Sequence, residues 1–177
     1  MVSRYDKFVA YLIILQRAFS QGSACPPGWK NWNQSCYAIY FNRVSWMDAS
    51  EFCESRGSHL VMPNSQPEND FIWRMMTERL KSLSGAGVWI GCKRKSADSS
   101  FVCAGNEGMS YTNWAPGNPK NKETPVCALY GVDGEGKWKS VGCTPRIGRN
   151  VVCEMPTAPR MYCMTADENG RLVNDLP

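Results

Sequence analysis

The sequence predicts an α+β domain that is held together by disulfide bonds. Two segments with helix-capping signals come first, and short apolar segments separated by Gly-, Pro- and Asn-rich connections follow from Val88 onward. Helices followed by strands favour two helices packed on a largely antiparallel sheet. The chain has nine cysteines in 177 residues and no CxxC pair at zinc-finger spacing, which indicates disulfides and an oxidising compartment.

Residues 1–20 are typical of a secretory signal peptide. Arg4 and Lys7 precede a short apolar run, Phe8–Leu15, and Ala18-Phe19-Ser20 places small residues before a cleavage position. The alternative is a membrane anchor, but a spanning helix needs about 20 apolar residues and this run is far shorter. We therefore expect a secreted, extracellular protein without a membrane span.

The tripeptide Asn33-Gln34-Ser35 is an N-glycosylation sequon. In a secreted chain we expect Asn33 to carry a glycan. The alternative is chance occurrence, because Ser35 adjoins a cysteine that would crowd the acceptor site.

Both predicted helices begin with a capping signal. In Ser45-Trp-Met-Asp48 a hydroxyl and a carboxylate satisfy free amide groups at the start of a helix that we expect to end at Gly57. The second signal is Ser65-Gln-Pro-Glu68, where the proline lacks an N–H that the first turn does not need. We expect the apolar residues that then recur at helical spacing to fill the core: Ile72, Met75, Met76 and Leu80.

From Val88 onward the pattern favours short strands. After Glu154 the chain has two prolines and a polar end, so we expect residues 155–177 to form a loosely ordered tail. The expected strands are Tyr37–Phe41, Val88–Gly91, Phe101–Cys103, Val126–Tyr130, Lys137–Trp138 and Val151–Cys153.

A series of short motifs runs through the chain in a characteristic order. They are Cys25-Pro-x-Gly-Trp29, Ser35-Cys-Tyr37, Trp46-x-Asp-Ala49, Phe52-Cys53, His59-Leu-Val61, Trp89-Ile-Gly91, Asn113-Trp114, Gly136-x-Trp138, Cys143 and Val152-Cys-Glu154. In this order they resemble C-type lectin-like domains, and the resemblance covers residues 25–154. It implies a double-looped α+β domain in which a short sheet joins the two termini and a long loop carries the ligand site.

The resemblance also implies a cysteine pairing that nine cysteines alone would not fix. It pairs Cys53 with Cys153 and Cys127 with Cys143. The further pair of Cys25 and Cys36 would mark the long form of the domain, which has an extra N-terminal hairpin.

Three cysteines remain after this pairing: Cys92, Cys103 and Cys163. Because Cys92 and Cys103 lie on either side of an expected hairpin, we expect them to bond to each other. Closing a loop of this size stabilises the fold by roughly 2–3 kcal/mol. Cys163 in the tail would then be unpaired, which favours a disulfide-linked homodimer or, alternatively, a capped thiol.

The long loop departs from the motifs with which sugar-binding members of this family chelate calcium. Those members use Glu-Pro-Asn or Gln-Pro-Asp in the loop and Trp-Asn-Asp on a later strand, whereas this chain has Asn118-Pro119-Lys120 and Trp138-Lys139-Ser140. Lysine offers only donors, and at about 4 Å from a dication it costs on the order of 8 kcal/mol at an effective dielectric near 20. We therefore expect no calcium at this sugar site, although Pro119 can keep the family's cis peptide bond.

A second calcium position in the family lies between the second helix and the last strand. Glu68 and Glu154 stand at this position. The alternative is structural, because Glu68 caps a helix and Glu154 is a usual end of the domain. We expect no required cofactor, and a structural calcium ion at these two residues is the alternative.

Basic residues are concentrated in the half of the chain that carries the long loop. Between Val88 and Val152 nine basic residues oppose five acidic ones, a balance of +4 that equals the net charge of the chain. Such a surface attracts polyanions, and a merely solvated surface is the alternative. The candidate ligand-binding residues are Asn118, Lys120, Lys122, Lys137, Lys139 and, as an aromatic platform for a sugar ring, Trp114.

These features favour a secreted recognition protein, in defence or in matrix, that binds carbohydrate or an anionic polysaccharide without calcium. The alternative is calcium-independent recognition of a protein partner at the same face. An enzyme is not expected, because the only histidine, His59, lies in a framework motif and no carboxylate pair stands out. A nucleic acid partner is not expected either.

Overall fold

A computed structural model describes residues 25–80, 87–106, 108–120, 125–131, 135–145, 148–157, 164–166 and 172–174. The chain divides into two units, Pro26–Pro156 and the chain ends on either side of it. In the second unit, β9 (Met164–Ala166) pairs antiparallel with β10 (Leu172–Asn174). The sequence analysis predicted no strand here, although Asn169-Gly170, a dipeptide typical of hairpin turns, lies between these two segments.

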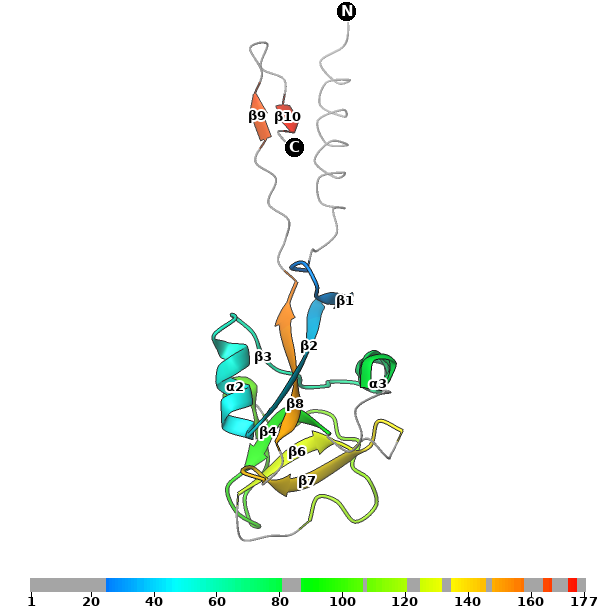
Figure 1. Ribbon diagram of the computed structural model, residues 1–177, viewed down its shortest axis with the longest axis vertical. Coiled ribbons are helices and arrows are strands. Elements are labelled where there is room, and N and C mark those ends of the chain that lie inside the picture. The colour runs from blue at the N-terminus through cyan, green and yellow to red at the C-terminus, as the bar shows by residue number, and fades with distance from the viewer. Residues whose placement is uncertain are drawn as a thin grey trace, which may run out of the picture. The chain divides into compact units, whose positions relative to one another are not determined.

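Eight strands of the larger unit form one sheet in the order β1-β2-β8-β4-β6-β7, with β3 paired to β8 and β5 paired to β4 (Figure 1). Neighbouring strands are antiparallel except for β4 and β8, which run parallel where Val88 lies beside Asn150. The α+β prediction is confirmed, and the sheet is mixed. The strands are β1 (Lys30–Trp32), β2 (Ser35–Val44), β3 (His59–Leu60), β4 (Val88–Arg94), β5 (Val102–Cys103), β6 (Val126–Tyr130), β7 (Trp138–Gly142) and β8 (Arg149–Pro156).

Helix α2 (Trp46–Glu54) begins at the predicted capping box. The Ser45 hydroxyl accepts a hydrogen bond from the Asp48 backbone N–H at 3.2 Å and donates one to the Asp48 carboxylate at 2.7 Å. Gly57, with a φ of 65°, follows the last turn in the left-handed conformation that ends helices. The buried face of this helix carries Trp46, Ala49 and Cys53.

Helix α3 (Gln66–Leu80) begins at the second capping signal. The Ser65 hydroxyl accepts a hydrogen bond from the Glu68 backbone N–H at 3.4 Å. The prediction that the methionine-rich stripe fills the core is confirmed for three of its residues, whereas the side chain of Leu80 lies outside the described residues. The three buried residues are Ile72, Met75 and Met76.

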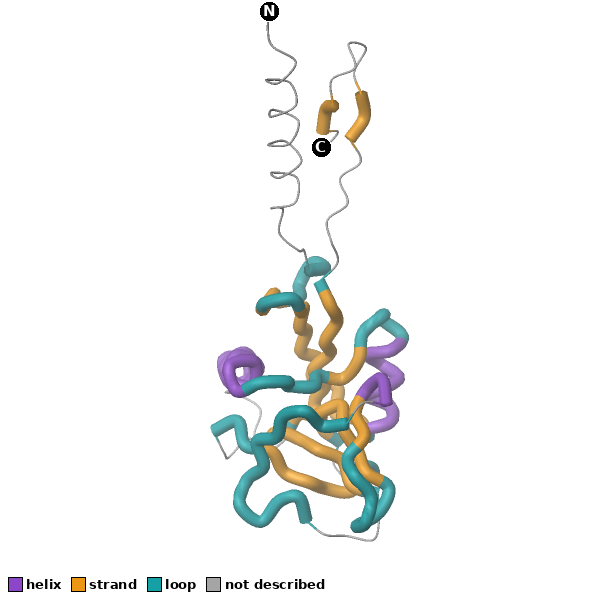
Figure 2. Tube along the Cα trace, turned by 180° about the vertical axis from the view of Figure 1, so that it is seen from behind, coloured by secondary structure: helices purple, strands orange, loops and turns teal. Residues whose placement is uncertain are grey.

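The two helices lie on opposite sides of the long strands β2 and β8 (Figures 1 and 2). One core cluster contains Trp138 and Tyr130 together with residues of α3, and the other contains Trp89 and Leu129 together with residues of α2. Because side chains alternate along a strand, the strands β4, β6 and β7 contribute to both cores. This alternation decides which side chains of β7 face the long loop.

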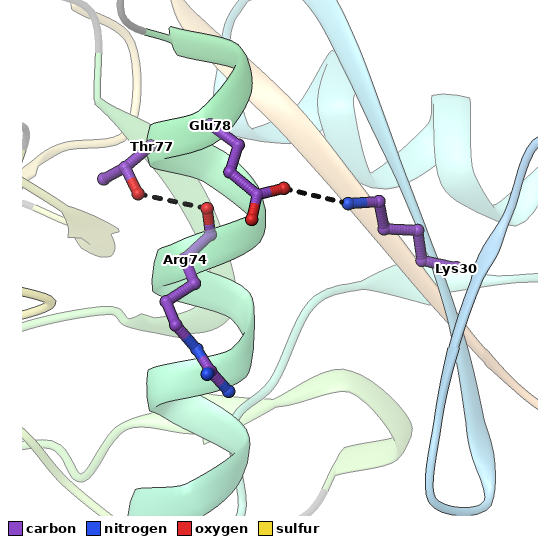
Figure 3. A network of polar contacts seen from close by, with 4 residues as sticks. All are labelled: Lys30, Arg74, Thr77 and Glu78. Atoms are coloured by element: carbon purple, nitrogen blue, oxygen red, sulfur yellow. Dashed lines mark hydrogen bonds and ion pairs between the residues drawn. The ribbon is translucent and has the colours of Figure 1, made fainter.

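An ion pair links the β1–β2 hairpin to α3. Lys30 Nζ lies 3.1 Å from the Glu78 carboxylate, and the Thr77 hydroxyl donates a hydrogen bond to the Arg74 carbonyl one turn earlier in α3 (Figure 3). Both partners of the ion pair are exposed, so the pair contributes at most about 1 kcal/mol. Asn33 is exposed in the turn of this hairpin.

Disulfide bonds connect distant parts of the larger unit. Cys53 is bonded to Cys153, Cys127 to Cys143, and Cys92 to Cys103 across β4 and β5. Cys25 and Cys36 are each disulfide-bonded as well. Cys163 lies outside the described residues.

Candidate ligand-binding site in the long loop

The long loop is attached to the outer edge of strand β7. The backbone N–H of Trp138 donates to the Asn113 carbonyl at 2.9 Å, and the Ala115 N–H donates to the Trp138 carbonyl at 2.8 Å. These two bonds make a short parallel bridge between Trp114 and Trp138. The segment that precedes the Asn118-Pro119-Lys120 motif is therefore held by backbone pairing.

The side chains of Asn118 and Ser140 contact each other where calcium-binding relatives place metal ligands. Asn118 Oδ1 accepts a hydrogen bond from the Ser140 backbone N–H at 3.0 Å, and the Ser140 hydroxyl lies 3.4 Å from the same oxygen. The Ser140 hydroxyl also accepts from the Lys120 backbone N–H at 2.7 Å. The peptide bond before Pro119 is cis.

A buried arginine fixes the backbone of Lys120. Arg94 Nη2 donates a hydrogen bond to the Lys120 carbonyl at 2.7 Å, and Nη1 donates to the Ala97 carbonyl at 3.3 Å. Its guanidinium lies 5.3 Å from the centre of the Phe101 ring. Arg94 was counted in the sequence only as one of the basic residues, and its position at the end of a buried strand gave no signal that it would hold this loop.

Lys137 is bonded to the long loop, and Lys120 is an exposed residue of that loop. Lys137 Nζ donates to Asn113 Oδ1 at 2.5 Å, while Asn113 Nδ2 donates to the Gly136 carbonyl at 3.0 Å. The carbonyl of Lys120 is taken by Arg94, and its ammonium-bearing side chain extends from an exposed residue. Both ammonium groups thus belong to the surface formed by the long loop and the start of β7.

The two other candidate lysines are Lys139 and Lys122. On β7, Trp138 and Ser140 are buried toward the long loop, so alternation directs Lys139 to the opposite face. There Lys139 pairs across the strands with Leu129, which belongs to the core cluster of α2. The prediction that Lys139 replaces a metal ligand stays a prediction, and the contact with Asn118 is made by Ser140. Lys122 lies outside the described residues.

Trp114 packs inward instead of presenting a free face. Its ring centre lies 5.1 Å from that of Phe101 and 5.7 Å from that of Trp138, in tilted and edge-on arrangements. The residue is half-buried. Such packing stabilises the loop and leaves only part of the indole available to a ligand.

Asn69 on α3 forms hydrogen bonds that hold β6, β7 and the segment before β7 together behind the site. The sequence analysis did not identify it. Its Oδ1 accepts hydrogen bonds from the Tyr130 hydroxyl at 2.9 Å and from Trp138 Nε1 at 2.8 Å, and its Nδ2 donates to the Gly136 carbonyl at 3.3 Å. The residue is fully buried. A polar residue beside a capping glutamate looks like part of an exposed first turn, so no pattern in the sequence identifies this role.

The two glutamates of the second candidate metal position lie close together and are buried. The Tyr37 hydroxyl donates to Glu68 Oε1 at 2.5 Å and lies 3.2 Å from Glu154 Oε1. The remaining oxygens accept backbone N–H bonds, Glu68 from Asn64 at 2.8 Å and Glu154 from Met62 at 3.1 Å. Each of the four carboxylate oxygens therefore has a partner within the protein.

Burial governs the protonation of this cluster. Desolvation, followed by repulsion from the Glu68 carboxylate, raises the pKa of Glu154 above its ordinary value of 4.5. Burial also raises the pKa of Tyr37 above its ordinary range, so its hydroxyl stays protonated. A hydroxyl has one hydrogen, and the second contact of Tyr37 is satisfied when Glu154 carries a proton. The Tyr37 hydroxyl and two backbone N–H groups thus contact all four carboxylate oxygens, and a calcium ion would need about six oxygens, of which this pair supplies only a part.

The described residues contain neither a candidate metal cluster nor a helix suited to cross a membrane. Within the ranges given above, no group of three or more His, Cys, Asp or Glu side chains is arranged to hold a metal ion. Among the same residues, no helix is long and apolar enough to cross a membrane.

Comparison with known proteins gives the relatives of this chain. The family described as the lectin C-type domain matches residues 42–155. One chain of snaclec salmorin from Gloydius brevicauda is 32% identical over 135 residues, which are 73% of this chain and 82% of that protein. One chain of the snaclec coagulation factor IX/factor X-binding protein from Gloydius halys is 29% identical over 81% of this chain and 92% of its own. The mouse scavenger receptor C-type lectin carbohydrate-recognition domain is 28% identical with a TM-score of 0.63, covering 76% of this chain and 100% of that structure.

Proposed function

The chain belongs to the C-type lectin domain family, whose members are recognition proteins and not enzymes, and we propose that it is an extracellular protein that binds anionic polysaccharide at its long loop without calcium. The contact surface in this proposal is formed by the long loop and the start of β7, with the ammonium groups of Lys120 and Lys137 as its charged residues. We call this surface the loop face. Asn118 and Ser140 form its base.

The observation that carries the proposal is the hydrogen bond between Asn118 and Ser140. Calcium binding would need the Asn118 side-chain oxygen, and that oxygen already accepts the Ser140 N–H at 3.0 Å. The neighbouring position is Lys120, whose backbone N–H is bonded to the Ser140 hydroxyl. A cation there would meet N–H donors and a lysine, which are groups that attract anions and repel a metal ion.

The charge of the loop face favours a negatively charged ligand. Lys120 and Lys137 are both exposed, and the buried guanidinium of Arg94 adds a third positive charge behind the Lys120 carbonyl. Clustered positive charge raises the local concentration of polyanions and speeds their association, and salt weakens both effects. Sulfated or uronic acid polysaccharides supply this charge at regular spacing together with hydroxyl groups.

A glycan array tests the proposal. The full chain is applied to neutral, sulfated and uronic acid glycans, with and without a calcium chelator, at low and at raised salt. Binding to the anionic glycans that persists in chelator and fades with salt supports the proposal. Binding to a neutral sugar that requires calcium would contradict it.

A second candidate is recognition of a protein by the same face. The similarity to a snaclec that is named for binding coagulation factors IX and X favours it, because that protein covers most of this chain. An acidic protein surface would meet the same lysines. Absence of binding across the array, with capture of an acidic protein that is lost on changing Lys120 and Lys137 to glutamine, would replace the first candidate with this one.

The compartment and assembly state are part of the same proposal. Secretion after removal of residues 1–20 would allow the disulfides to form and Asn33 to be glycosylated in its exposed turn. We further propose that Cys163 links two chains into a homodimer, since eight other cysteines are disulfide-bonded already. Two loop faces in one molecule would raise the avidity for a repetitive polysaccharide.

A further inference from the structure

Arg94 joins the long loop to the connection between β4 and β5, residues 95–101, which we call the β4–β5 turn. Arg94 is the last residue of β4 and pairs with Val126 of β6, so the sheet fixes its backbone. Its Nη1 donates a hydrogen bond to the Ala97 carbonyl at 3.3 Å, and its Nη2 donates one to the Lys120 carbonyl at 2.7 Å. Because both nitrogens belong to one planar guanidinium, the two carbonyl groups lie close together.

The β4–β5 turn is held by the hydroxyl of Ser99. Ser99 Oγ accepts hydrogen bonds from the backbone N–H of Lys95 at 3.1 Å and of Ser96 at 2.9 Å, and it donates to the Ser96 carbonyl at 3.0 Å. These bonds close the turn around Ala97, whose carbonyl is an acceptor for Arg94. A series of hydrogen bonds therefore runs from Ser99 through Arg94 to the long loop.

At the other end of this series, both backbone groups of Lys120 are held. Its N–H donates to the Ser140 hydroxyl at 2.7 Å, and its carbonyl accepts from Arg94. The residue itself is exposed. Because the backbone on either side of its Cα is fixed, the direction in which the side chain leaves the loop is set before a ligand arrives. A preorganised contact binds more tightly, since less conformational freedom is lost on binding.

We propose that the β4–β5 turn controls the affinity of the loop face for anions, acting through Arg94 and Lys120, an inference that rests on the proposed function. Arg94 is a positioning residue, only 8% exposed, and its effect comes from the fork of two donors in addition to its charge. A lysine there would keep the charge but would offer one nitrogen in place of the fork. The ring of Phe101, at the end of the turn, lies 5.1 Å from that of Trp114 and adds a second contact between the turn and the loop.

A titration of dextran sulfate into the full chain tests the role of Arg94. Arg94→Lys leaves the net charge unchanged and should weaken binding about threefold, because Lys120 loses its fixed position. In a Lys120→Gln background Arg94→Lys should cause no further loss, whereas in a Lys137→Gln background the threefold loss should persist. General damage to the fold would lower the affinity in both backgrounds alike.

Hydrogen exchange followed by mass spectrometry tests the same series of bonds without a ligand. Arg94→Lys and Ser99→Ala should each speed exchange of the peptide that contains the Lys120 amide, about threefold or more. Ser100→Ala, on an exposed serine of the same turn, is the matched control and should leave this exchange unchanged. Ser99→Ala also serves as the test if Arg94→Lys does not fold.

The outcomes separate this proposal from the proposed function. Unchanged exchange in Ser99→Ala and Arg94→Lys, equal exchange in Ser99→Ala and Ser100→Ala, or equal losses of affinity in the two lysine backgrounds would overturn the control by the turn. If the unchanged protein did not bind dextran sulfate, the proposed function would be wrong, and faster exchange in the two variants would still support the connection from the turn to Lys120.

Discussion

Asn118 Oδ1 lies 3.0 Å from the backbone nitrogen of Ser140 and accepts its hydrogen bond. This one contact joins the loop that precedes β6 to the strand that follows it. It uses the oxygen that a calcium ion would need, and it places the Lys120 N–H against the Ser140 hydroxyl. The loop is therefore stabilised by protein hydrogen bonds at the place where a metal ion could otherwise do so.

Removing the Ser140 hydroxyl should destabilise the loop. Ser140 is buried, and its oxygen is the acceptor for the Lys120 N–H, so Ser140→Ala should lower the free energy of unfolding by about 1–2 kcal/mol. Urea denaturation followed by tryptophan fluorescence measures this change. Ser110→Ala, on an exposed residue of the same loop, is the control and should change stability by less than about 0.5 kcal/mol.

The lysines of the loop face should carry anion binding, and Lys139 should not. Changing both Lys120 and Lys137 to glutamine should weaken binding of a sulfated polysaccharide about tenfold at low salt, because two attractive charges are lost. Lys139→Gln removes the same charge from the opposite face of β7 and should weaken it far less. Titrations of the two variants decide the point, and equal losses would contradict the placement of Lys139.

Among the polar residues behind the site, substitution of Asn69 should reduce the stability of the fold most. In Asn69→Ala the Tyr130 hydroxyl and Trp138 Nε1 lose their buried acceptor, so the unfolding free energy should fall by about 2–4 kcal/mol. Chemical denaturation tests this. An Asn31→Ala variant, whose side chain is exposed, should remain close to the unchanged protein.

Stability should depend on pH through Glu154. Its pKa is raised in the folded state, so the native protein binds this proton more tightly than the unfolded chain does. The resulting stabilisation is fully present below the ordinary value of 4.5 and is lost as the pH rises through the folded-state pKa. Melting temperatures measured across this range should show the loss, and Glu154→Gln should flatten it.

Calcium binding to Glu68 and Glu154 would raise stability at neutral pH, whereas loss of the Glu154 proton lowers it. If a cation held Glu68 and Glu154, added calcium would raise the melting temperature at neutral pH and a chelator would lower it. We expect neither change, because the Tyr37 hydroxyl and two backbone N–H groups already occupy the carboxylate oxygens. A calcium-dependent rise that disappears in Glu154→Gln would show that the pair is a metal site.

The elements whose signals are local could be predicted from the sequence. The helix starts at Ser45 and Ser65 follow from capping residues, and the buried stripe of α3 follows from helical spacing. The parallel contact of β4 with β8 was not predicted, because no local pattern reports which distant strands become neighbours. The same limit applies to Asn69 and Arg94, whose partners are far away in the chain.

The lysines illustrate that a sequence motif alone does not tell on which face of a strand a side chain lies. Lys139 stands in the motif position of a metal ligand, whereas the alternation of β7 puts it on the strand face opposite to that of Trp138 and Ser140, and Ser140 contacts Asn118. A one-residue difference in a strand changes the face to which a side chain belongs. The residue types could therefore be read from the sequence, whereas the face of β7 on which each side chain lies depends on the register of β6 and β7.

The most direct test of calcium-independent anion recognition is a titration of sulfated polysaccharide into the full chain, once in calcium and once in excess chelator. We predict the same affinity in both solutions and a steep loss of affinity as salt is raised, because lysine ammonium groups make the contact. Binding that appears only with calcium, and that persists at high salt, would contradict this account.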